Sequence, residues 1–196
     1  MDPVDRGFKD PSKPVGPYYS AEMAERLQQE RGWRMAERPG MGWRRVVASP
    51  RPRGIVEIHT IADAVSHGHL VIAGGGGGIP VLQRGGSLQG VEAVIDKDFT
   101  ASLLAVALQA KRFVILTDVP HASMDYGKAS QSPIRTLSAD DAGRLLKRGE
   151  FPPGSMGPKV EASLIYARAT GCKALITDLT HLERALEGRE GTWIEP

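Results

Sequence analysis

The chain has little of what marks several broad classes of protein. It has a single cysteine, Cys172, so it cannot form an internal disulfide, and no histidine or carboxylate beside it indicates a nucleophile. The formal charge of +2 is small, and no basic stripe indicates a nucleic-acid partner. No apolar run approaches the roughly 20 residues that span a bilayer, and no signal-peptide pattern opens the chain. We therefore expect a cytoplasmic protein with no membrane contact.

The residues up to the connector near Arg53 differ in character from those that follow. They are rich in Pro, Gly and Trp, and a helix is predicted that Ser20 caps and Gly32 ends. Two short strands are predicted after it: Met35 to Glu37 and Trp43 to Val47. We expect residues 1–53 to form a small subdomain with a connector, and residues 54–196 to form an α/β core.

Apolar runs and helical periodicity alternate in the downstream part. The runs are typical of buried parallel strands and are Leu70 to Ala73, Phe113 to Leu116 and Ala174 to Ile176. The predicted helices are Thr60 to His67, Asp96 to Leu108, Ser138 to Arg148, Pro158 to Thr170 and His181 to Glu187. This alternation implies right-handed crossovers and a mostly parallel sheet that helices cover on both faces.

Five glycines, Gly74 to Gly78, follow the first of these runs, at the end of the strand where open parallel sheets bind ligands. Without side chains, their amides can approach a small anion and adopt positive φ. A flexible connector is the alternative, but Ile79 and Pro80 would stiffen it. The run lacks the Gly-Lys-Ser/Thr ending of a Walker A loop and the acidic partner of a dinucleotide fingerprint.

Three lysines are placed where they can meet an anion. Lys97 stands between Asp96 and Asp98 at the mouth of a predicted helix, where two carboxylates can hold it or orient a magnesium ion. Lys159 follows a proline-rich loop at a helix N-terminus, and Lys13 lies in a proline-bracketed extended segment. For Lys97, the alternative is that an aspartate caps the helix and the lysine is a solvated neighbour. For Lys159, the alternative is a loop that is rigid only for packing, and Lys13 could be an ordinary surface lysine.

The histidines do not predict a metal site. His67 and His69 flank Gly68 at an expected helix C-terminus, where a favourable interaction with the helix dipole is enough to explain them. The sequence also offers no third ligand for a metal ion. His59, His121 and His181 stand isolated in the sequence.

Several long motifs, in order, resemble the carbamate kinases, a group within the amino acid kinase superfamily, from about Asp10 to Trp193. They are KPVGPYYS at Lys13, GWRRVVASPRPRGIVEI at Gly42, VIAGGGGGIPV at Val71, GVEAVIDKDFTASLLA at Gly90, VILTDV at Val114 and FPPGSMGPKVEA at Phe151. The resemblance implies a three-layer α/β/α sandwich with a mostly parallel sheet, and a protruding subdomain from Lys13 to Val47.

The resemblance also implies a role for each matched residue. Lys97 and Lys159 would neutralise the transferring phosphoryl group, Asp96 and Asp98 would complete the catalytic set, and Lys13 would hold the carbamate. Gly74, Gly75, Gly76, Gly77 and Gly78 would line the phosphate and carbamate pocket. The nucleotide would be bordered by Thr117, Asp118, Val119, Tyr126, Met156 and Gly157. The lysines and the glycine bend are expected to converge on one oxyanion pocket.

The implied activity is reversible phosphoryl transfer between ATP and carbamate, giving ADP and carbamoyl phosphate, with Mg²⁺ accompanying the nucleotide. A homodimer and a place in arginine or purine-derivative catabolism are expected by family analogy. Rival interpretations are another kinase of the superfamily that forms acyl phosphates, and an inactive remnant that binds nucleotide or a partner.

Two departures from the family pattern qualify the activity that we expect. The first third of a family-length protein, with its Gly-Gly-Asn phosphate loop, is not in the sequence, so we expect an N-terminally truncated sheet with an open strand edge. Ser123 stands where the family has a tyrosine near the adenine, although Tyr126 could substitute. Our hypothesis is that the chain alone has little or no kinase activity.

Overall fold

A computed structural model describes residues 1–196 and divides into two compact units. The first consists of Met1–Arg53 and Gly74–Asp96, and the second consists of Gly54–Ala73 and Lys97–Pro196. The segment with the five glycines therefore belongs to the same unit as the N-terminal residues, whereas the sequence grouped it with the downstream core.

The first unit contains an antiparallel sheet with strand order β1-β3-β2. Its elements are α1 (Arg6–Lys9), β1 (Lys13–Tyr19), α2 (Ala21–Arg31), β2 (Met35–Arg38), β3 (Gly42–Val47) and the paired strands β4 (Val81–Arg84) and β5 (Ser87–Gly90). The Ser20 hydroxyl accepts a hydrogen bond from the amide of Met23, and Gly32 ends α2 with a φ of 63°. The predicted helix and both predicted strands of this region are thus confirmed.

The second unit contains a four-stranded sheet with strand order β6-β10-β11-β9. Its elements are α3 (Ile58–Ser66), α4 (Lys97–Ala107), β6 (Phe113–Thr117), β7 (Ser123–Met124), β8 (Ser132–Pro133), β9 (Thr136–Ser138), α5 (Ala139–Lys147), α6 (Met156–Thr170), β10 (Ala174–Asp178), α7 (Leu182–Leu186) and β11 (Thr192–Glu195). The pairs β6–β10 and β9–β11 are parallel and the pair β10–β11 is antiparallel. The sheet is therefore mostly parallel, as predicted.

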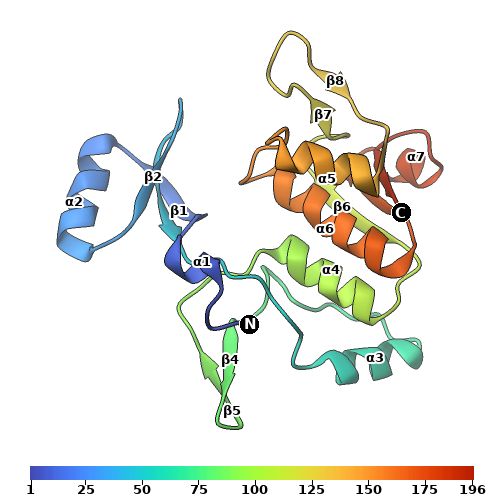
Figure 1. Ribbon diagram of the computed structural model, residues 1–196, viewed down its shortest axis with the longest axis horizontal. Helices are drawn as coiled ribbons and strands as arrows, with labels where there is room; N and C mark the ends of the chain where they lie inside the picture. Colours follow the sequence, from blue (N-terminus) through green and yellow to red (C-terminus); the bar gives the residue numbers. More distant parts are fainter. The chain divides into compact units, whose positions relative to one another are not determined.

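Helices pack on this sheet because its strands are apolar on both faces. In Figure 1, α4, α5 and α6 lie together beside β6, and α6 contacts β6, β10 and β11. Ala174 and Ile176 of β10 are fully buried in the core on that face. The alternate residues Leu175 and Thr177 are also fully buried, and α7 contacts the same strand. Burial on both faces of β10 is the local signature of an α/β/α arrangement.

The prediction of a buried strand from Leu70 to Ala73 is wrong. These residues form no strand and pair with none, and the side chains of Leu70 and Ile72 are 96% and 94% exposed. A strand is stable only where a neighbour accepts its backbone hydrogen bonds. Strand β6 pairs with β10 on one side only, so apolar composition alone does not make this segment a strand.

Candidate functional site

A buried ion pair lies at the start of α6. Lys159 Nζ lies 2.9 Å from Oδ2 of Asp98 on α4, and the two side chains are only 11% and 7% exposed. The rigid loop before the helix sets this position: the amide of Gly157 donates to the carbonyl of Pro152 at 2.9 Å. Pro158 is the third residue of α6, where the missing N–H has no partner within the helix to lose. The ammonium group is thus held at a helix N-terminus, a position that favours anions.

A second lysine shares the same carboxylate. Lys97 Nζ lies 3.8 Å from Oδ1 of Asp98, and the Lys97 side chain is 56% exposed. One carboxylate therefore faces two ammonium groups, one buried and one accessible. Such a cluster retains net positive charge, as an anion-binding site requires.

Lys13 is held by a carboxylate in the first unit. Its ammonium group on β1 donates to Oδ2 of Asp96, and the side chains are 28% and 10% exposed. Asp96 thus contacts Lys13, whereas Asp98, two residues further on, contacts both Lys97 and Lys159. The structure thus assigns each predicted catalytic carboxylate to a cation within its own unit. The convergence of Lys13, Lys97 and Lys159 on one oxyanion stays a prediction.

The five glycines form a turn that other residues would strain. The amide of Gly77 donates to the carbonyl of Gly74 at 2.7 Å. All of the glycines except Gly76 have positive φ, with a value of 138° at Gly77. A Cβ atom on Gly77 would collide with the carbonyl oxygen of Ile95, the residue before Asp96. The turn is therefore packed against the chain that carries Asp96, and it is not a loose connector.

The predicted polar residues lie at the carboxyl ends of two neighbouring parallel strands. Thr117 of β6 is in register with Asp178 of β10, and the Thr117 hydroxyl donates to Asp118 at 3.0 Å. Nδ1 of His181 lies 2.8 Å from Oδ1 of Asp178. Burial raises the pKa of Asp178, but hydrogen bonds from the His181 ring and amide outweigh it and leave that pKa below its ordinary value. His181, which is isolated in the sequence, therefore has a carboxylate partner.

A hollow of about 390 Å³ lies beyond the end of β6. It is lined by Val119, Pro120, His121, Ser123, Tyr126, Gly127, Gln131 and Pro133. Two residues predicted to border the nucleotide, Val119 and Tyr126, are thus brought together there. Met156 and Gly157 open α6 and do not line the hollow. The volume lies within the range of small-molecule pockets, roughly 300 to 1,000 Å³.

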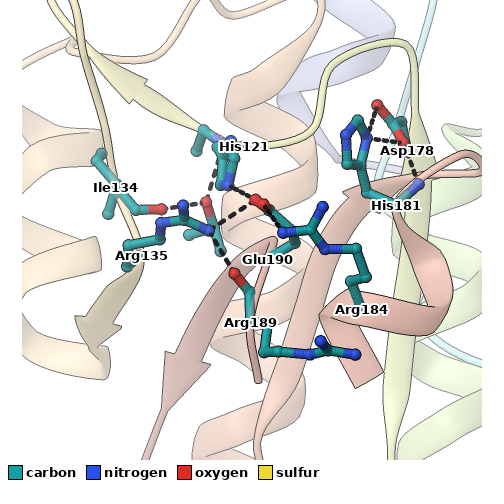
Figure 2. A network of polar contacts seen from close by, with 10 residues as sticks. His121, Ile134, Arg135, Asp178, His181, Arg184, Arg189 and Glu190 are labelled. Carbon is teal, nitrogen blue, oxygen red and sulfur yellow. Dashed lines mark hydrogen bonds and ion pairs between the residues drawn. The ribbon is translucent and has the colours of Figure 1, made fainter. Parts of the chain in front are cut away.

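A polar network behind this hollow was not predicted from the sequence. Figure 2 shows His121, Arg135 and Arg184 pointing toward the carboxylate of Glu190. His121 thus contacts Glu190 in the fold, although the sequence did not indicate a partner for it. No sequence signal could have found this network, because its members lie up to 69 positions apart and share no motif. The chain contains no group of three or more His, Cys, Asp or Glu side chains that could hold a metal ion.

The α/β layering, the strand-end polar residues and the lysines held by aspartates define an α/β protein with a cluster of positive charge. Residues 8–178 match the family model described as the amino acid kinase family. The chain belongs to the amino acid kinase family, and its predicted fold class is confirmed.

Its relatives include carbamate kinases. The chain is 47% identical to the carbamate kinase of Thermococcus kodakarensis over 99% of its length and 62% of that protein. It is 45% identical to the carbamate kinase of Pyrococcus furiosus over all of its length and 62% of that protein. The carbamate kinase of Giardia lamblia bound to AMP-PNP superposes with a TM-score of 0.84 at 41% identity, covering 99% of this chain and 62% of that one. The chain thus spans about three-fifths of the length of these relatives.

Proposed function

We propose that this chain serves a carbamate kinase reaction, the reversible transfer of a phosphoryl group between ATP and carbamate that gives ADP and carbamoyl phosphate. The observation that carries the proposal is the pair of ammonium groups on Asp98, one buried and one accessible, in a chain so similar to carbamate kinases. Phosphoryl transfer needs little covalent help from protein, and positioned positive charge stabilises its transition state.

The lysines divide the work of binding in this proposal. Lys159 is fixed by Asp98 and would neutralise the transferring phosphoryl group without reorganising during the reaction. Lys97 would contact the same group from the solvent side, because its side chain is more than half exposed. Lys13 would bind the carbamate end, while the glycine turn offers backbone amides to phosphate oxygens.

The hollow beyond β6 is the proposed binding place for the base of the nucleotide. The side chain of Tyr126 is 58% exposed and can lie against a flat ring, while Ser123 and Gln131 offer polar atoms to its edge. Thr117 and Asp118 end the strand that leads to the hollow. Met156 and Gly157 would border the nucleotide from the first turn of α6.

Several accompanying properties are also proposals. Mg²⁺ would arrive with the nucleotide and be coordinated mainly by its phosphates, as is usual for this ion. No helix in the structure has the length and apolar character that crossing a membrane requires. We place the protein in the cytoplasm as a homodimer, by analogy with what the family resemblance implies.

ATP formation from ADP and carbamoyl phosphate tests the proposal directly. We expect any ATP formed to require both substrates and to disappear in Lys159→Met. Phosphorylation of an amino acid carboxylate, with no reaction of carbamate, would overturn the choice of substrate. Turnover of about 1 to 100 per second, the usual range for kinases, would refute our hypothesis that the chain alone has little or no activity.

A nucleotide-binding protein without turnover is the second candidate. Two observations favour it: Leu70 and Ile72 are almost fully exposed, and strand β6 of the same unit has one unpaired edge. Titration calorimetry with ADP, combined with the assay for ATP formation, distinguishes the two. Heat of binding without ATP formation would support this second candidate.

A further inference from the structure

We propose that Glu190 is a positioning residue that fastens both sides of the hollow beyond β6 and thereby sets its affinity for nucleotide. The inference rests on the proposed function, because it assigns a nucleotide to that hollow. Glu190 itself does not line the hollow, so it acts only through the residues that it holds.

The hollow is formed by the two stems of one hairpin. The first stem leaves β6 and runs through His121 into β7, and the second runs through Pro133 at the end of β8. The short strands β7 and β8 pair through only two residues each. So short a ladder does little to fix the stems, and other contacts must set the width of the hollow.

Glu190 contacts one side chain from each side of the hairpin. Its Oε2 atom lies 2.8 Å from NH1 of Arg135, which follows the second stem, and 2.9 Å from Nε2 of His121 on the first. The Arg135 contact is a hydrogen bond, whereas the His121 contact is a close approach without hydrogen-bond geometry. Arg184 of α7 adds a second arginine, 3.3 Å from Oε1. The Glu190 side chain is 14% exposed, so water screens these contacts only in part.

A neighbouring hydroxyl fastens the same two stems at their backbones. The hydroxyl of Thr192 accepts from the amide of Ala122 at 2.9 Å and donates to the carbonyl of Ile134 at 2.6 Å. The amide of Ile134 in turn donates to the carbonyl of Ala122 at 2.8 Å. Glu190 and Thr192 stand two residues apart where the chain enters β11. One short segment therefore holds both walls of the hollow.

The charge on Glu190 persists over a wide range of pH. The hydrogen bond from Arg135 lowers the pKa of Glu190 below its ordinary value, burial opposes this, and the charges of Arg135, Arg184 and His121 add to the lowering. The Glu190 carboxylate is therefore ionised at neutral pH, where it accepts the hydrogen bond from Arg135. A stem freed from this carboxylate would lose preorganisation, which weakens binding without changing the chemistry of transfer.

Replacement of the carboxylate with an amide of the same shape tests the inference. We expect Glu190→Gln to raise the Kd for ADP, measured by titration calorimetry, by roughly tenfold. We also expect faster hydrogen exchange at the amides of Ala122 and Ile134. Where the chain turns over, KM for ADP should rise while kcat stays the same. The matched control is Glu187→Gln, since Glu187 pairs with Arg189 on the same segment and is half exposed, and it should leave the Kd unchanged.

A second variant guards against a general folding defect. Arg135→Gln keeps Glu190 and frees the second stem alone, so it should weaken ADP binding while circular dichroism stays that of the unsubstituted protein. An unchanged Kd in both Glu190→Gln and Arg135→Gln would overturn the inference but leave the proposed function standing. Failure of the unsubstituted protein to bind ADP would overturn both.

Discussion

At the scale of single residues, Asp98 takes part in both folding and the proposed chemistry. A buried ammonium group is unfavourable unless a carboxylate compensates it, and Lys159 is almost as buried as Asp98. The same carboxylate also faces Lys97. Its loss would therefore leave two positive charges together, one of them nearly without solvent. This arrangement makes the stability and the phosphoryl-binding role of the pair separable by experiment.

We expect Asp98→Asn to lower the free energy of unfolding by about 3 kcal/mol, the usual cost of removing one partner of a buried pair. The double substitution Asp98→Asn with Lys159→Met removes both charges and should recover most of that loss. Urea unfolding measures both effects. Any phosphoryl transfer should fall at least a hundredfold in the double variant, the order of effect expected when a charge-stabilising group is removed. A double variant as unstable as the single one would contradict the charge-compensation argument.

At the scale of elements, the glycine turn shows that backbone geometry, and not only the missing side chains, selects the residue type. Gly77 has a φ of 138° and faces the carbonyl of Ile95, whereas Gly76 has an ordinary φ and open space around it. The two positions are adjacent and chemically identical in the sequence. Only the fold distinguishes the glycine that is required from the one that is tolerated.

This contrast predicts unequal effects of the same substitution. Gly77→Ala should lower the melting temperature by several degrees, since strain and a backbone collision together cost at least about 2 kcal/mol. Gly76→Ala should change it little or raise it slightly, because it only reduces the freedom of the unfolded chain. Thermal unfolding followed by tryptophan fluorescence suits this test, since Trp33 and Trp43 lie in the same unit as the turn. Equal shifts in the two variants would contradict the argument that the fold distinguishes Gly77 from Gly76.

Elements whose signals are local could be predicted from the sequence, and those that depend on distant partners could not. The helix between Ser20 and Gly32 has its cap and its stop within its own residues. By contrast, the strand predicted at Leu70 to Ala73 required a neighbour that composition does not reveal. The Glu190 network lies outside sequence reasoning for the same physical reason, since His121 and Glu190 meet only through the packing of β11 beside the hairpin. For the candidate site, the sequence predicted that Lys159 and Asp98 belong to the same site. It did not predict that these two side chains pair with each other.

At the scale of the whole molecule, an apolar segment around Leu70 and Ile72 is left exposed to solvent. Leu70 and Ile72 are almost fully exposed, and in the same unit Leu179 is 74% and Leu116 of the β6 edge 44% exposed. Unpaired strand edges and exposed apolar side chains promote association between chains. The chain also spans only 62% of the length of the carbamate kinases to which it is similar. Its surface should therefore behave differently from that of a fully covered α/β protein.

We expect the chain to self-associate with rising concentration and to bind the dye 8-anilinonaphthalene-1-sulfonate in its native state, because water contacts this apolar segment. The double substitution Leu70→Gln with Ile72→Gln should reduce both effects and leave the melting temperature unchanged, since side chains that are exposed contribute little to folding. Val4→Gln is the matched control, because Val4 is 75% exposed but belongs to the other unit. Sedimentation velocity and dye fluorescence over a wide range of concentration measure the outcome. A monomer at every concentration would contradict the predicted self-association, and association that the double substitution leaves intact would mean that other surfaces of the chain cause it.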